Sequence, residues 1–139
     1  MNVNYAYISV AVLIMVLKRI VEAISEYKSI ENEIRNYNKK DTVNMTPDEM
    51  NRFRHIAASA LYVQKGYEEI IVNCLGQLKE IVDICKKLSF TDSSFDLKNN
   101  QIGRKIGKQF RYKNKKEMFD YIFKTEINFR RPVSKQIKF

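Results

Sequence analysis

The chain has 139 residues, 45% of them hydrophobic, with only four Gly and two Pro, so it is long enough for one core of ordinary size and is unlike a disordered chain. Its net charge is +9, and the excess lies at one end: residues 1–100 hold 13 Lys/Arg and 13 Asp/Glu, whereas residues 101–139 hold 12 and 3. A basic block attracts phosphate on nucleic acid, nucleotides or anionic membranes, although Lys-rich helices are also often only soluble.

The cysteines and the single histidine exclude two classes of small protein. Cys74 and Cys85 stand 11 positions apart in one predicted helix, about 16 Å along its axis, which is beyond disulfide reach. Two such cysteines with His55 supply no zinc-type ligand cluster. We therefore expect two buried thiols and no disulfide scaffold.

The chain opens with an uncharged stretch, residues 3–17, inside a predicted helix that occupies residues 1–38. A helix that is apolar all round must be buried in protein or in lipid. Two interpretations remain open: a long core or homo-oligomer helix, and a membrane anchor or uncleaved insertion signal. No basic residue precedes Lys18, which is unlike a cleaved signal peptide. A secreted or membrane-associated location is slightly favoured over a cytoplasmic one.

A helical core is predicted for residues 46–125, after a polar loop at 38–45. Thr46-Pro47-Asp48-Glu49 is a strong helix start with a capping box, and Gly66 suits its end. The small residues at 57–60 would let another helix approach closely. Residues 67–88 show the apolar period of a third helix.

Two further helices are expected before a loose end. The fourth would begin near Ser94 or Asp96, after a break at 89–94, and reach Gly107 or Phe110; the fifth would span 114–125. Residues 126–139 read as a basic, extended or loose tail. The predicted fold is all-α, a single-domain bundle of about five helices with a long apolar N-terminal helix.

Asp96, Asn99 and Asn100 stand out within the fourth helix, because all three residue types are poor helix formers. In the first turn, Asp96 would cap free N–H groups. The spacing places the three on one face, where they either bond the preceding backbone or form a site. His55 shares a face of its own helix with Ser59 and Tyr62, although a single helical His is often only a packed or surface residue.

Two segments, RFRHIAASALYVQKGYEEIIVNCLGQLKEIVD and DLKNNQIGRKIG, resemble a family of uncharacterised helical bacterial domains. Those domains stand at the C-terminal ends of secreted, Rhs-type or cell-surface proteins. The likeness covers roughly residues 51–108, with departures at Asn51, where Asp is usual, and Lys79, where His is frequent. It picks out Arg54, His55, Glu80, Asp96, Asn99, Asn100, Gly103 and Arg104. It implies a toxin-like or effector-like module with an immunity-type protein partner.

The predicted site combines acid/base and polar binding groups. His55, Asp96 and Glu80 are the candidate catalytic residues, since a His oriented by a carboxylate is a competent general acid/base near neutral pH. The candidate substrate-binding residues are Arg54, Asn99, Asn100 and Arg104, which offer amides and positive charge.

A hydrolase or transferase acting on an envelope polymer, lipid or nucleotide would fit this set. No residue declares itself a nucleophile. No cofactor is expected; a second version places Ca²⁺ or Mg²⁺ on Glu80, Asp96 and Asn100.

A non-enzymatic binder of nucleic acid or of an anionic membrane is the alternative. Its candidate anion-binding residues are Lys105, Lys108, Arg111, Lys113, Lys115 and Lys116. Phe110 and Tyr112 would be available to stack on bases. No nucleic-acid fold signature accompanies this charge.

Overall fold

The computed structural model describes residues 3–40, 44–85 and 90–139, with side chains described at 7–39, 44–81 and 96–139. The helices are α1 (Val3–Lys40), α2 (Pro47–Gln64), α3 (Glu69–Cys85), α4 (Phe90–Gln109) and α5 (Lys115–Ile122). Short helical turns follow at Phe123–Ile127, Asn128–Arg130 and Val133–Lys135. Among the described residues there is no strand, so the predicted all-α fold of five helices is confirmed.

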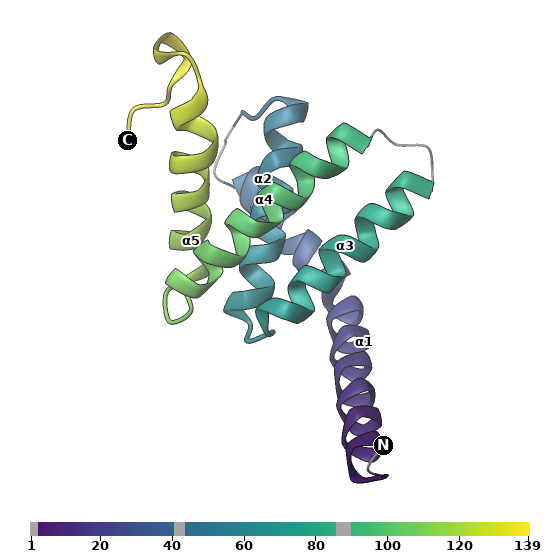
Figure 1. Cartoon of the computed structure of the whole chain (residues 1–139). Helices are drawn as coiled ribbons and strands as arrows, with labels where there is room; N and C mark the ends of the chain where they lie inside the picture. The colour runs from purple at the N-terminus through teal and green to yellow at the C-terminus, as the bar shows by residue number, and fades with distance from the viewer. Residues whose placement is uncertain (1–2, 41–43, 86–89) are drawn as a thin grey trace.

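Helix α2 lies at the centre of the bundle, where α4 crosses it and α1, α3 and α5 pack around the pair (Figure 1). Its buried side chains hold the core together. Phe53 stacks on Tyr37 of α1 with ring centroids 5.5 Å apart, and Phe119 of α5 meets both rings edge-on. Such aromatic pairs each add about 0.5–1.5 kcal/mol beyond burial, so they join both ends of the chain to α2.

The predicted limits of α2 are confirmed in detail. The Glu49 N–H donates to Thr46 Oγ1 at 3.2 Å, and the Thr46 N–H donates to Glu49 Oε2 at 3.0 Å, which is the reciprocal capping box. At the other end Gly66 has φ +98°, a left-handed conformation that favours glycine.

Two glycines allow α4 to lie directly on α2. A Cβ at Gly103 would collide with the backbone oxygen of Ile56, and one at Gly107 with that of Ala60. The predicted close approach at the small-residue run of α2 is therefore confirmed, and its partner is α4. This contact sets the position of the α4 residues that precede Gly103.

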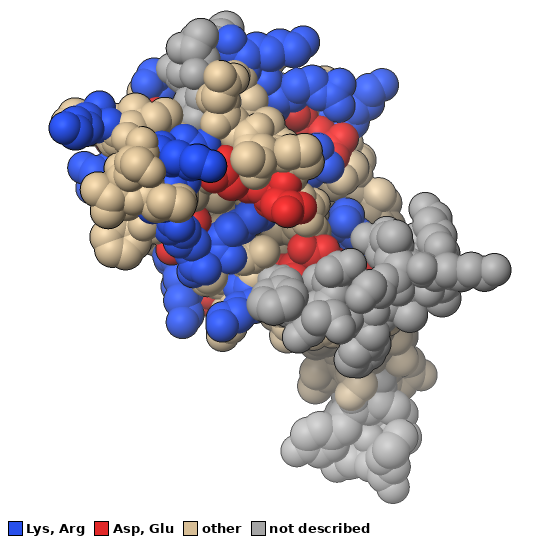
Figure 2. Space-filling model, turned by 90° about the horizontal axis from the view of Figure 1, so that it is seen from above, with Lys and Arg blue, Asp and Glu red and all other residues tan. Residues whose placement is uncertain are grey.

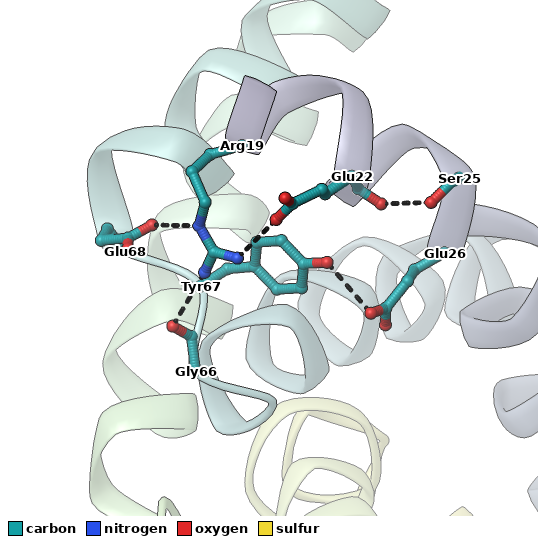
Figure 3. A network of polar contacts seen from close by, with 7 residues as sticks. All are labelled: Arg19, Glu22, Ser25, Glu26, Gly66, Tyr67 and Glu68. Carbon is teal, nitrogen blue, oxygen red and sulfur yellow. Dashed lines mark hydrogen bonds and ion pairs between the residues drawn. The ribbon is translucent and has the colours of Figure 1, made fainter. Parts of the chain in front are cut away.

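Side chains near the middle of α1 bind the turn between α2 and α3 (Figure 3). Arg19 Nε donates to Glu68 Oε2 at 3.2 Å, and its Nη1 donates to Glu22 at 2.8 Å. The guanidinium also lies 4.4 Å from the centre of the Tyr67 ring, whose hydroxyl donates to Glu26. These contacts fix the direction in which the first part of α1 leaves the bundle.

Before Arg19, α1 projects away from the other helices (Figure 1). Most of its large apolar side chains from Tyr7 to Leu17 are more than half exposed, and Val16 is the one that packs against the core. Within the described residues, no helix has the combination of length and apolar character that crossing a membrane requires.

The fourth helix and the C-terminal segment differ from expectation. α4 already includes Phe90, so Asp96 lies beyond its first turn and the predicted capping role is wrong. Residues after 126 are not loose. Arg131 donates to both carboxylate oxygens of Glu49 at 2.8 and 2.7 Å. The Asn128 amide nitrogen donates to the Ile137 carbonyl at 2.8 Å, and the Ile137 N–H donates to Asn128 Oδ1 at 2.8 Å. Side-chain partners thus hold the C-terminal segment against the start of α2.

Candidate functional site

His55, Glu80 and Asp96 come together from α2, α3 and α4. Their ligating atoms all lie within 4.8 Å of one another, although the residues are up to 41 positions apart in the sequence. His55 Nε2 lies 3.2 Å from Asp96 Oδ2, and both side chains are largely buried, at 7% and 15% exposure. The three candidate catalytic residues therefore form one cluster.

Asn100 completes the surroundings of the imidazole. Its Oδ1 lies 3.2 Å from His55 Nδ1, and its side chain packs over Gly76 of α3. A Cβ at position 76 would stand 2.7 Å from Asn100 Nδ2, so a larger residue would displace this amide from its place beside His55. Asp96 and Asn100, four positions apart on α4, thus hold opposite nitrogens of one ring.

Burial lowers the pKa of His55 below its usual 6.5. The positive charges of Lys79 and Arg54 act in the same direction, while the Asn100 hydrogen bond and Glu80 oppose them. A lowered pKa favours the uncharged ring. A neutral imidazole has one N–H and one lone pair, and its tautomer decides which neighbour receives the proton.

A cavity of about 480 Å³ opens beside the imidazole, between α1, α2, α3 and α4. His55 and Asn100 form part of its wall. Ser59 and Tyr62 also line it, so the prediction that they share a face of α2 with His55 is confirmed. Its volume is within the range of small-molecule sites. The polar cluster therefore faces a space large enough for a substrate.

The deeper side of the cluster holds oxygen atoms that suit a cation. Glu80 is 3% exposed, and its Oε1 has no hydrogen-bond partner in the described part of the chain. Asp96 Oδ1 accepts a bond from Asn51 Nδ2 at 3.5 Å. One imidazole nitrogen and two carboxylate oxygens could hold a divalent cation. Asn100 bonds the opposite ring nitrogen, as partners of ligating histidines commonly do.

Asn99 and Arg104 lie apart from this cluster. Asn99 Oδ1 accepts a 2.7 Å bond from Arg52 Nη1, and the same guanidinium bonds the carbonyl and carboxylate of Glu126. Neighbouring helical residues point in directions about 100° apart, so Asn99 and Asn100 cannot share a face. Arg104, whose pKa is lowered by burial, lies two turns beyond Asp96, and Arg54 alone of the predicted arginines lines the cavity.

The predicted anion-binding residues are exposed. On the face drawn in Figure 2, Lys and Arg side chains are numerous and some acidic side chains lie among them. Lys108 bonds Glu69 at 2.8 Å, Lys115 bonds Glu33 at 2.6 Å, and Lys116 bonds Asp120 at 2.8 Å. Lys113 lies over the Phe110 ring, 5.2 Å from its centre. Phe110 itself is buried, so of the two rings predicted to stack on bases only Tyr112, 95% exposed, is accessible.

Several contributors to the site were missed by the sequence reasoning. Gly76 carries no signal in a single sequence, since it is one glycine within a helix. Asn51 was named only as a departure from the resembled family, where Asp is usual. Arg52 was not singled out as a site residue. Cys74 is half-buried and free, unlike the fully buried thiol expected, and the Cys85 side chain lies outside the described residues.

No family model, no curated protein and no solved structure matches this chain.

Proposed function

We propose that this chain is a toxin-like or effector-like hydrolase whose reaction centres on His55. The observation that carries the proposal is the imidazole held between Asp96 and Asn100 at the wall of a cavity. A buried histidine needs partners for its polar atoms, and here one partner is a carboxylate that can orient the ring. The resemblance to C-terminal bacterial domains supports the effector context.

In the proposed mechanism, His55 Nε2–H donates to Asp96 Oδ2, which leaves the Nδ1 lone pair toward Asn100 and the cavity. The Asn100 amide then turns away from Nδ1, so that a water molecule from the cavity can donate to this single lone pair. Nδ1 takes a proton from a water molecule as the water oxygen attacks the substrate carbon or phosphorus. The resulting imidazolium returns that proton to the leaving oxygen when the scissile bond breaks.

Two positively charged groups support this chemistry. Arg54 and Lys79 both line the cavity, and each can stabilise negative charge that develops on the attacked group. They also favour the neutral ring, because each opposes protonation of His55. Glu80 is assigned to support of the ring from its buried side.

The projecting part of α1 is the segment we propose for contact with a membrane surface or with a second copy of the chain. Its apolar side chains from Tyr7 to Leu17 are exposed, except that of Val16. An effector of this type would be secreted or membrane-associated and would have an immunity-type protein partner in its producer.

The test is expression of the protein in a bacterial host under an inducible promoter, with and without export. We expect growth inhibition that His55→Gln abolishes, because Gln keeps polar atoms in the pocket but cannot act as a base near neutral pH. Lys28→Glu, an exposed change on α1, is the control and should inhibit like the parent. Undiminished inhibition by a folded His55→Gln protein would refute the proposal.

A non-enzymatic binder is the second candidate, favoured by one observation. Tyr112 is 95% exposed and lies between Arg111 and Lys113, an arrangement that suits stacking on bases beside a phosphate backbone. This candidate predicts retention on single-stranded nucleic acid that falls steeply with salt and is insensitive to His55→Gln.

A further inference from the structure

The cavity beside His55 is polar at one end and apolar at the other. On α2 its lining runs from Asn51 and Arg54 to Tyr62, and eight positions of helix cover about 12 Å. The chain turns back after α2, so α3 runs in the opposite direction and contributes Lys79 beside the polar end. The cavity is therefore long enough to hold two chemically different parts of one ligand.

Apolar side chains from three helices surround the other end. Tyr62 donates its hydroxyl to the Ala23 carbonyl at 2.6 Å, which places the neighbouring Ile24 of α1 at this end. Val72 and Leu75 of α3 precede Gly76, the residue that supports Asn100, and so lie on the side away from Lys79. An apolar group lodged here would be removed from water, which contributes about 25 cal/mol per Å² of buried area.

Three charged side chains line the cavity. Arg54 and Lys79 are positive, and Glu31, whose Oε1 accepts a 2.8 Å hydrogen bond from the Tyr27 hydroxyl, is negative. The carboxylates of Asp96 and Glu80 lie beside His55 but outside this lining. Arg54 and Lys79 are therefore the groups that a negatively charged part of a ligand would meet in the cavity.

Apolar side chains also surround the opening. Ile24 is 55% exposed and Leu78 is 47% exposed, and both line the cavity. On α1, Val21 and Leu17 are also exposed, and they lead into the projecting segment. Exposed apolar side chains next to a binding cavity are typical of a protein that receives its ligand from a lipid surface.

From these features we infer that the cavity binds an anionic amphiphile, a membrane lipid ester with an acyl chain. The chain lies among Ile24, Val72 and Leu75, the ester carbonyl lies beside His55, and the anionic headgroup meets Arg54 and Lys79. The proposed binding of this ligand does not depend on the proposed hydrolase function. The cleavage of its ester bond does.

In that cleavage, water adds its oxygen to the ester carbon and gives a proton to His55, and the carbon–oxygen bond to the alcohol then breaks. His55 returns the proton to the alcohol oxygen, so the products are a fatty acid and the deacylated lipid. Binding itself requires no catalysis and is measured separately.

The probe for binding is dansyl-undecanoic acid, an anionic amphiphile whose fluorescence rises in an apolar site. We expect saturable enhancement with the whole chain and with His55→Gln. Ala58→Phe, which fills the cavity wall from α2, should weaken binding at least tenfold. The matched control, Ala11→Phe, adds the same ring on the exposed part of α1 and should bind normally.

Charge is tested with Arg54→Glu and Lys79→Glu against Lys28→Glu. The first two should weaken binding at least fivefold, and the third should leave it unchanged. Absence of enhancement, or equal loss in Ala58→Phe and Ala11→Phe, would overturn the inference even if His55→Gln abolishes growth inhibition. Conversely, if the probe binds normally and the His55→Gln protein still inhibits growth, the hydrolase proposal is refuted and the amphiphile-binding site is supported.

Discussion

The imidazole of His55 has a different partner on each side, and this is what makes it unlike an ordinary packed histidine. Asp96 lies at Nε2 and Asn100 at Nδ1, each at 3.2 Å. Burial keeps the ring neutral, and a neutral ring with a carboxylate on one nitrogen can accept a proton on the other. The polar pairing and the lowered pKa therefore act together.

The adjacent residues Asn99 and Asn100 provide a direct test at this scale. Asn100→Ala should abolish growth inhibition while the protein stays folded, because it removes the group beside Nδ1. Asn99→Ala should keep the activity but lose about 2 kcal/mol of stability, since it breaks the Arg52 hydrogen bond. Growth assays and thermal unfolding measure the two effects, and a reversed pattern would contradict the site assignment.

The sequence could predict a residue's role only where helical spacing fixes the face of the helix on which the residue lies. The spacing of Asp96 and Asn100 correctly predicted a shared face, whereas Asn99 was grouped with them although it bonds Arg52. The partner of a side chain depends on which helix lies opposite, and a single sequence does not specify that. Gly76 was missed for the same reason, because its role exists only once Asn100 lies over it.

At the scale of the elements, the contact between α2 and α4 determines the site. Gly103 and Gly107 let the two backbones approach, and the position of α4 on α2 places Asp96 and Asn100 beside His55. The glycine in the Asp-x-x-Asn-Asn-x-x-Gly-Arg pattern thus has a packing role. The sequence predicted close approach from the small residues of α2 but did not identify the helix that approaches.

Gly103→Ala should therefore damage both fold and site. Its Cβ would meet the Ile56 backbone oxygen and the Ser59 side chain, and backbone on α2 cannot yield as a side chain can. We expect a loss of about 3 kcal/mol in the free energy of unfolding. Gly66→Ser is the contrasting change, since nothing lies within 4 Å of its Cβ and its only cost is the positive φ. Urea unfolding of both variants compares the costs, and equal costs would contradict the packing role.

Some helix ends could be predicted from the sequence and others could not, and the reason is physical. Caps are local, so the start of α2 at Thr46 and its end before Gly66 could be read directly. The start of α4 could not, because its early residues are helical despite poor intrinsic propensity. The C-terminal segment was expected to be loose, but partners distant in sequence, such as Glu49 for Arg131, hold it in place.

Across the whole molecule, charge and apolar surface are distributed in ways that composition alone did not show. The basic excess of residues 101–139 is partly matched by acidic side chains of earlier helices, as between Lys115 and Glu33. The uncharged stretch at the start was expected to be buried in protein or in lipid, and in the structure it projects from the bundle. Composition records how many such residues there are, while their partners depend on the fold.

The central claim is a neutral His55 with its proton on Nε2, and the single histidine makes it directly measurable. ¹⁵N NMR of the imidazole distinguishes the two tautomers and follows protonation with pH. We predict the Nε2–H form at pH 7 and a pKa below 6.5, so that the ring gains its charge only as the pH falls further. An Nδ1–H ring whose Nε2 signal shifts when Zn²⁺ is added, or a ring already charged at pH 7, would contradict His55 as the base.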